Sequence, residues 1–171
     1  KLSFFFKFIK WYNSIRKKFN STIRMTKSKI TSKIIHASSI EINGRGAVIL
    51  GKSGTGKSNL AIKLISMGAN LISDDQTHLK LTEDKIIITK PISTPKLIEA
   101  RGIGLLHAPY VLSSELFCFI KITDLELPRL PHSKIKNCLG KKIKMLEFNP
   151  IYNNESALFL GLRYGISNNK I

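Results

Sequence analysis

Apolar positions near the middle of the chain predict a buried strand followed by a helix. Residues 46–50, Gly-Ala-Val-Ile-Leu, form a short continuous apolar run of the kind that a buried parallel strand shows. After a glycine-rich interval, apolar residues recur at helical spacing over 59–65, and Gly68 supplies a stop signal. The pattern therefore predicts a strand, a loop and a helix in direct succession.

Alternating positions on both sides of this unit predict antiparallel hairpins. Two short β-like runs lie within 33–46, and the pair Asn43 and Gly44 marks a tight turn that leads into the strand. Residues 77–89 alternate about a central acidic pair, which indicates a second hairpin. Together these elements predict an α/β domain with a parallel core.

The interval between the strand and the helix fits the phosphate-binding loop pattern of Gly, any four residues, Gly-Lys and Ser at every required position. Its glycines free the backbone so that successive N–H groups wrap an anion at the start of a helix. Lys57 would reach the outer phosphates, and Ser58 would offer its hydroxyl to the Mg²⁺ that bridges β- and γ-phosphates. The predicted nucleotide site is Gly51-Lys52-Ser53-Gly54-Thr55-Gly56-Lys57-Ser58.

Two adjacent carboxylates, Asp74 and Asp75, end the apolar run 70–73. We expect this run to be the next strand of the sheet, with its carboxyl end at the same crevice as the loop. Adjacent strand residues point in opposite directions, so one carboxylate would hold Mg²⁺ and the other would accept a hydroxyl proton. The alternative is that the acidic pair only opens a turn. The loop upstream favours the functional interpretation.

Three further side chains are weaker candidates. Glu99 and Arg101 are two residues apart and would share one face of a strand, as a metal ligand beside a phosphate clamp or as a structural ion pair. Gly102 and Gly104 would allow the backbone to approach closely. His36 is the only histidine near the loop in sequence, although a lone histidine there is more often a solvated turn residue.

Composition narrows the class of protein. The length of 171 residues fits one domain, and two cysteines cannot form a disulfide framework, so a reduced, cytosolic setting fits. Cys118 lies in an apolar run and reads as a small buried thiol. The net charge of +17 suggests nucleic acid as a partner, but basic residues are spread along a chain rich in Ile and Asn. A codon bias explains that mixture, so we expect no specific nucleic-acid binding.

The two ends of the chain are expected to lie outside the catalytic domain. We expect a basic extension over 1–33, a catalytic domain over 34–165 that ends in a capped helix, and a disordered tail over 166–171. For residues 1–24 the favoured interpretation is that Met25 is the true start of the protein. The first 24 residues would then be a gene prediction extended too far upstream or a disordered tail. The alternative is a basic amphipathic helix on an anionic membrane surface, because lysines interrupt the apolar residues too early for a span. No small-residue cleavage site marks a secretory signal.

Taken together, these residues resemble the catalytic domain of HPr kinase/phosphorylase, most closely its short form without the N-terminal domain. The resemblance covers about residues 34 to 130. A Glu-x-Arg-Gly-x-Gly segment after a phosphate loop and an Asp-Asp pair is far more selective than the loop alone. The matching stretches are His36 to Gly46, Gly51 to Ser58, the helix to Gly68, Leu71 to Asp75 and Ile98 to Gly104.

The resemblance implies a serine kinase that uses ATP and Mg²⁺ to phosphorylate HPr, the small phosphocarrier protein of sugar phosphotransferase systems, and so regulates carbohydrate metabolism. Family members also remove the phosphate by attack of inorganic phosphate, which yields pyrophosphate. They share a phosphate-loop sheet of the phosphoenolpyruvate carboxykinase-like type and assemble as hexamers, so a cytoplasmic homo-oligomer is expected.

The resemblance also implies roles for individual residues. The loop would bind the nucleotide phosphates, with Ser58 and Glu99 as metal ligands. Asp74 or Asp75 would be the base, His36 would lie near the catalytic aspartate, and Arg101 would lie beside the transferring phosphate.

Two departures from the family pattern leave alternatives open. Asn59 stands where the long members have Glu, and 150–153 lacks the Gly and Arg of the expected Pro-Gly-Arg-Asn stretch. Both departures bear on phosphorylase activity more than on ATP binding. One alternative is a nucleotide-binding regulatory module whose phosphotransfer has decayed, and another is a small-metabolite kinase that uses the same loop.

Overall fold

The computed structural model describes residues 31–132 and 134–167, which belong to one compact unit that begins at Thr31. The expectations for residues 1–24, and for the tail beyond residue 167, lie outside the described residues. No helix of the described part is long and apolar enough to cross a membrane.

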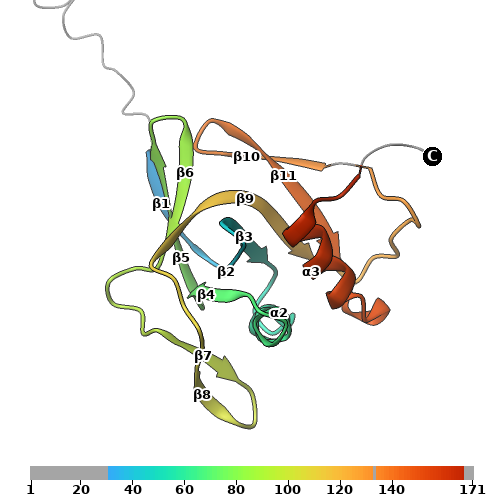
Figure 1. Ribbon diagram of the computed structural model, residues 1–171, viewed down its shortest axis with the longest axis horizontal. Coiled ribbons are helices and arrows are strands. Elements are labelled where there is room, and N and C mark those ends of the chain that lie inside the picture. Colours follow the sequence, from blue (N-terminus) through green and yellow to red (C-terminus); the bar gives the residue numbers. More distant parts are fainter. Residues whose placement is uncertain (1–30, 133, 168–171) are drawn as a thin grey trace, which may run out of the picture. The chain divides into compact units, whose positions relative to one another are not determined.

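Within the described residues, nine strands form one mixed sheet (Figure 1). Its path runs β1-β5-β6-β9-β3-β2-β4, and β11, which pairs with β10, extends from β9. The strands are β1 (Ser32–His36), β2 (Ser38–Ile42), β3 (Arg45–Leu50), β4 (Asn70–Ser73), β5 (Gln76–Thr82), β6 (Lys85–Thr89), β9 (Ser113–Ile122), β10 (Lys134–Cys138) and β11 (Lys141–Phe148).

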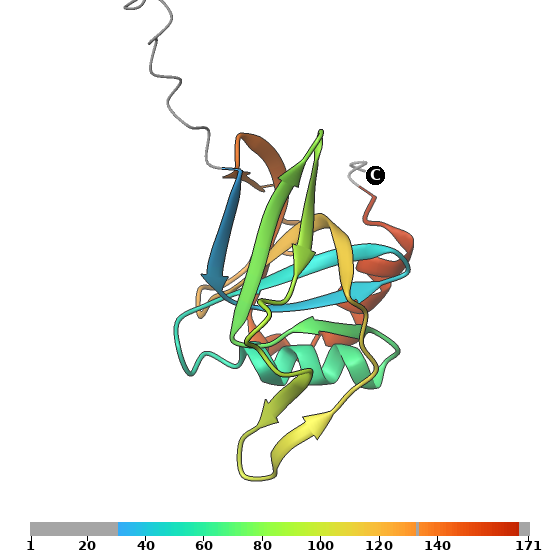
Figure 2. The same cartoon turned by 90° about the vertical axis from the view of Figure 1, so that its left-hand side faces the viewer.

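Two further strands form a hairpin of their own, β7 (Leu97–Ala100) with β8 (Gly104–His107). Figure 2 shows this hairpin standing apart from the main sheet, near the helix α2 (Lys57–Ser66) that lies along one sheet face. After β11, a 3-10 turn η1 (Pro150–Tyr152) leads to the helix α3 (Glu155–Tyr164). Lys63 of α2 and Glu155 of α3 form an ion pair of 2.7 Å that joins the two helices.

Alternation along β3 divides the apolar core between the two faces of the sheet. Ala47 and Ile49 face the helices, where they pack with Leu60, Leu64 and Phe159. Val48 points the opposite way, into a second cluster under the β5–β6 hairpin and β10. The phosphate loop therefore follows a strand that is buried on both faces.

The predicted strand, helix and hairpins are confirmed. Asn43 and Gly44, with φ of 54° and 81°, make a two-residue turn between β2 and β3, as a type I′ hairpin requires. Gly68, with φ of 107°, follows the last turn of α2. The terminal helix is also present, although its N-cap Asn154 makes no side-chain capping bond.

The expected parallel core is present in β3, β9 and β11, but the expectation that residues 70–73 form the next strand beside β3 is wrong. β3 is parallel to β9 but antiparallel to β2, and β2 separates β3 from β4. The tight turn at residues 43–44 explains this order, because it folds β2 directly against that side of β3. Since β3 and β4 are both antiparallel to β2, their carboxyl ends still reach the same edge of the sheet.

The expected common strand for Glu99 and Arg101 is also wrong. β7 ends at Ala100, and Arg101 begins the turn into β8. Gly102 and Gly104 have positive φ and no atom within 4 Å of an added Cβ, so they serve this turn and not a close approach.

Candidate phosphate-loop site

The loop between β3 and α2 owes its shape to glycines and to one threonine. Gly54 and Gly56 adopt φ of 78° and 92°, a region that other residues rarely enter. Thr55 closes the loop, because its hydroxyl donates to the Lys52 carbonyl at 2.9 Å. A Cβ at Gly51 would collide with that hydroxyl. The backbone is thus preformed around the start of α2, where its N–H groups can receive an anion.

Lys57 brings a buried positive charge into this loop. It is the first residue of α2, only 6% exposed, and its Nζ donates to the carbonyls of Gly51 at 3.2 Å and Lys52 at 3.1 Å. A third contact joins Nζ to His36 Nε2 at 3.1 Å. The ammonium is therefore held at the centre of the loop, where it can attract phosphate.

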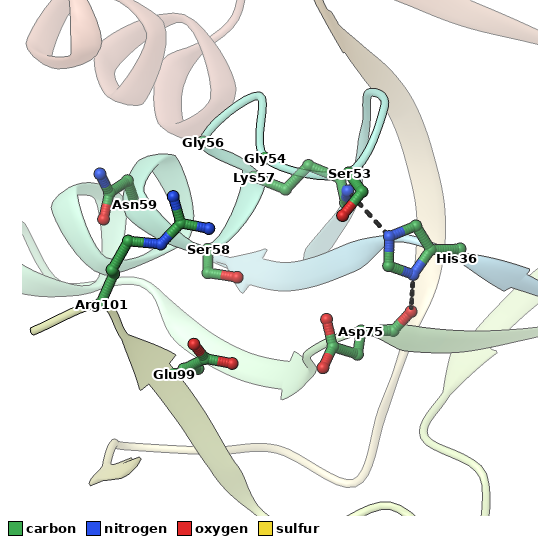
Figure 3. Close-up of a pocket in the computed structure, with 10 residues that line it drawn as sticks. All are labelled: His36, Ser53, Gly54, Gly56, Lys57, Ser58, Asn59, Asp75, Glu99 and Arg101. Atoms are coloured by element: carbon green, nitrogen blue, oxygen red, sulfur yellow. Dashed lines mark hydrogen bonds between the residues drawn. The ribbon is translucent and has the colours of Figure 1, made fainter. Parts of the chain in front are cut away.

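His36 links this lysine to the acidic segment after β4 (Figure 3). β1 pairs with β5 so that His36 lies opposite Gln76, and His36 Nδ1 lies 2.9 Å from the Asp75 carbonyl oxygen. A lysine ammonium only donates, so Nε2 accepts from Lys57 while Nδ1–H donates to the carbonyl. The contacts therefore assign a neutral ring with its proton on Nδ1.

Asp74 is a buried junction between three elements. It is 5% exposed, and its Oδ1 accepts from Ser58 Oγ at 3.0 Å and from Ser38 Oγ at 2.5 Å. Its Oδ2 accepts from the Glu99 backbone N–H at 3.3 Å, which ties the β7–β8 hairpin to the loop. Asp74 thus orients the hydroxyl of Ser58 and does not itself line the pocket.

Asp75 is exposed and lines the pocket, so the two carboxylates lie in different environments. The expectation that both lie in a strand is wrong, because β4 ends at Ser73. The left-handed backbone of Asp75, with φ of 62°, turns the chain from β4 into β5. Figure 3 shows the side chains of Asp75, Glu99 and Arg101 around the space in front of Ser58.

One cavity of about 190 Å³ gathers most of the predicted residues. Its side-chain oxygens, from Ser58, Asp75 and Glu99, are ligands of the type that Mg²⁺ prefers. Phosphate and water would supply the remaining coordination positions. The residues therefore fit a magnesium ion that arrives with a nucleotide. Among the described residues, no group of three or more His, Cys, Asp and Glu side chains could hold a metal by itself. The lining residues are His36, Ser53, Gly54, Gly56, Lys57, Ser58, Asn59, Asp75, Glu99 and Arg101.

Four predicted residues lie outside this cavity. Asp74 is behind it, and Gly51, Lys52 and Thr55 line a neighbouring groove on the other side of the loop. Sequence reasoning missed Ser38, a fully buried serine of β2 whose hydroxyl donates to Asp74. The sequence signal that could have identified Ser38 is that it is a polar residue within a β-like run, and this run precedes the strand before the phosphate loop.

The fold and this geometry define a phosphate-loop nucleotide-binding domain. A family model described as HPr Serine kinase C-terminal domain matches residues 28–117. The chain belongs to this family, and its fold is the α/β phosphate-loop domain of the phosphoenolpyruvate carboxykinase-like type.

Individual relatives agree with this assignment. The chain is 33% identical over 130 residues to the HPr kinase/phosphorylase of Lachnoclostridium phytofermentans, covering 74% of this chain and 42% of that protein. It is 39% identical over 84 residues to the HPr kinase/phosphorylase of Clostridium tetani, covering 48% of this chain and 28% of that protein. The chain thus spans less than half the length of these relatives.

A solved structure has the same fold. The Hpr(Ser) kinase/phosphatase from Coxiella burnetii superposes with a TM-score of 0.66 at 25% identity, covering 74% of this chain and 86% of that chain.

Proposed function

We propose that this chain is an ATP- and Mg²⁺-dependent kinase that phosphorylates a serine of an HPr-type phosphocarrier protein. The observation that supports the proposal most directly is that the side chains around one cavity are held in different ways. Lys57 is fixed in the loop, Asp74 orients Ser58, and Asp75 remains free to face an incoming hydroxyl. Nucleotide binding alone needs no exposed carboxylate beside the phosphate site, whereas transfer to a hydroxyl needs a proton acceptor.

In this reaction the serine oxygen forms a bond to the γ-phosphorus of ATP as the bond between that phosphorus and the β-bridging oxygen breaks. Asp75 accepts the proton of the serine hydroxyl. Lys57 and Arg101 offset the negative charge of the phosphates. When bound with the nucleotide, Mg²⁺ supplies further neutralisation of this charge, and Ser58 and Glu99 are the residues that would hold it.

Asp74, from behind the cavity, and His36, at its lining, position these groups. Asp74 accepts a hydrogen bond from the Ser58 hydroxyl, which leaves a lone pair of the Ser58 oxygen toward the cavity. His36 holds Lys57 against the loop and fixes the backbone of Asp75. We propose 34–165 as the catalytic domain and the cytoplasm as its location. We also propose that the protein is a homo-oligomer, which light scattering of the purified chain would test.

The test follows label from γ-labelled ATP to purified HPr in the presence of Mg²⁺. The full chain is compared with Lys57→Ala and with Lys80→Ala, a matched loss of an exposed lysine on β5. We expect a labelled serine on HPr with the wild type and Lys80→Ala, and none with Lys57→Ala. Binding of ATP without transfer to HPr would contradict the kinase and favour a decayed regulatory module. Turnover stimulated only by small alcohols would indicate a small-metabolite kinase.

A further inference from the structure

Two neighbouring serines at the start of β2 are shielded completely from solvent, although each carries a hydroxyl. Ser38 and Ser39 are both 0% exposed. A buried hydroxyl needs a hydrogen-bond partner, because leaving it unpaired away from water is costly. Successive residues of a strand point to opposite faces of the sheet, so the two serines meet their partners in two different environments.

Ser38 faces the side of the sheet that carries α2. It lies opposite Ile49 of β3, which packs in the apolar cluster between the sheet and the helices. Directly opposite side chains share one face of a sheet. The Ser38 hydroxyl donates to Asp74 Oδ1 at 2.5 Å, and the same oxygen accepts from Ser58 of α2 at 3.0 Å. Ser38 is therefore linked to Ser58 through a single carboxylate oxygen.

Ser39 faces the other side of the sheet. It lies opposite Val48, which packs in the second cluster under the β5–β6 hairpin. Ser39 Oγ lies 3.1 Å from Thr77 Oγ1 and donates to the Ser73 carbonyl at 3.4 Å. These contacts connect β2 with β4 and β5, and they do not involve Asp74. Ser39 thus provides a natural comparison for Ser38 within the same strand.

The two hydroxyl bonds to Asp74 Oδ1 differ in length. A hydroxyl that donates to a carboxylate typically lies about 2.5 to 2.7 Å from it, and such charge-assisted bonds are stronger than neutral ones. The bond from Ser38 lies in this range, whereas the bond from Ser58 is 3.0 Å long. Ser38 is therefore the stronger partner of this oxygen, and Ser58 adjusts to the position that the oxygen takes.

The three donors to Asp74 also belong to elements that are held in different ways. Ser38 comes from β2, which pairs with β3 on one side and β4 on the other. The Glu99 N–H comes from β7, which pairs with β8 in the separate hairpin, and Ser58 lines the cavity itself. Of these donors, Ser38 alone belongs to a strand inside the main sheet. The sheet thus orients the carboxylate independently of the segments that meet a ligand.

We propose that Ser38 is a positioning residue for the cation that accompanies the nucleotide: through Asp74 it holds the Ser58 hydroxyl with a lone pair toward the cavity. The inference rests on the proposed function, because it takes Mg²⁺ to arrive with the nucleotide at Ser58. Ser38 is fully buried and does not line the cavity, so it acts through two hydrogen bonds in series. Without its hydroxyl, Asp74 Oδ1 loses its stronger donor, and the carboxylate no longer holds Ser58 in one orientation.

The test measures ADP binding to the full chain by isothermal titration calorimetry at a series of Mg²⁺ concentrations. The readout is the Mg²⁺ concentration that gives half of the full gain in ADP affinity. Loss of a residue that hydrogen-bonds a metal ligand commonly lowers metal affinity about 10- to 100-fold, and Ser38 acts through one residue more. We therefore expect Ser38→Ala to raise this concentration by about five- to tenfold. Its affinity for ADP without Mg²⁺ should match that of the wild type.

The matched control is Ser39→Ala, which removes an equally buried hydroxyl from the next residue of β2 and should leave the Mg²⁺ requirement unchanged. Ser38→Thr keeps a hydroxyl at the position and should restore a requirement close to that of the wild type. Urea unfolding shows whether each variant is folded. Should Ser38→Ala not fold, Ser38→Cys takes its place, because a thiol has a similar shape and is only a weak donor.

The outcomes separate this inference from the proposed function. A wild-type Mg²⁺ requirement in Ser38→Ala, or in Ser38→Cys where that variant replaces it, would overturn the role of Ser38 and leave the proposed kinase standing. An equal increase in Ser39→Ala would do the same, because it would indicate a general effect of losing a buried hydroxyl. Wild-type protein that does not bind ADP, or whose ADP affinity gains nothing from Mg²⁺, would overturn both this inference and the Mg²⁺-dependent kinase.

Discussion

Replacing Asp74 by asparagine tests whether this residue is a structural junction that positions Ser58. The carboxylate accepts from two hydroxyls through Oδ1 and from the Glu99 N–H through Oδ2. An asparagine can satisfy the same three groups only with its oxygen toward the Glu99 N–H and its amide toward the hydroxyls. The hydroxyl of Ser58 must then accept instead of donate, so its lone pair turns away from the cavity.

The magnitude follows from the type of hydrogen bond. A bond to a charged group contributes about 1.5 to 3 kcal/mol, and a neutral bond contributes about 0.5 to 1.5 kcal/mol. Because the three bonds persist in weaker form, we expect Asp74→Asn to lower the free energy of unfolding by about 1 to 4 kcal/mol. Asp74→Ala would leave three donors without their acceptor and would cost more.

Urea unfolding followed by circular dichroism measures this loss directly. The matched control is Asp84→Asn, whose carboxylate is 94% exposed and pairs with Lys141 at 2.6 Å, and which should cost less than about 1 kcal/mol. Equal stability of Asp74→Asn and Asp84→Asn would refute the junction. A second readout is the affinity for ADP with and without Mg²⁺, where Asp74→Asn should reduce the gain that Mg²⁺ gives.

Three further predictions concern stability and reactivity. A hydrogen bond from Lys63 lowers the pKa of the Glu155 carboxyl below its usual 4.5, so its stabilising effect is present above that pH and is lost as the pH falls. Lys63→Met should therefore lower the urea midpoint slightly at neutral pH, and its difference from the wild type should shrink as the pH falls below 4.5, whereas a constant difference would contradict this. Burial raises the pKa of the Cys118 thiol to about 12, so Ellman's reagent should react with Cys118 only after unfolding, and rapid reaction in the native protein would refute it. Gly54→Ala has no steric neighbour within 4 Å but must adopt a φ of 78°, so thermal unfolding should report a loss of about 1 to 2 kcal/mol, and an unchanged midpoint would contradict this backbone cost.

Local sequence signals were sufficient for the elements around the loop. The Asn43 and Gly44 turn and the phosphate-loop pattern each depend on backbone conformations that only a few residues tolerate, so a short stretch identifies them. Strand alternation predicted a split of Asp74 and Asp75, but both residues follow the end of β4, and the left-handed backbone of Asp75 accompanies their different environments.

Features that depend on long-range pairing were not predictable in the same way. β10 and β11 carry many lysines and lack a clear apolar face, and β11 joins the sheet because it pairs with β9, which is distant in sequence. The place of β4 beside β2 depends on a pairing between segments that are separated in sequence by the loop and α2. The groove beside the loop joins residues from 50–55, 121–125 and 145–150, which no sequence window contains.

We infer that Asp75 accepts the serine proton in a phosphoryl transfer to HPr. This proton transfer is tested most directly by the rate at which Asp75→Asn labels HPr from γ-labelled ATP, measured beside its affinity for ADP. We expect a rate about 10² to 10⁴ times lower than that of the wild type, with the ADP affinity nearly unchanged. Transfer at the wild-type rate by Asp75→Asn would contradict it.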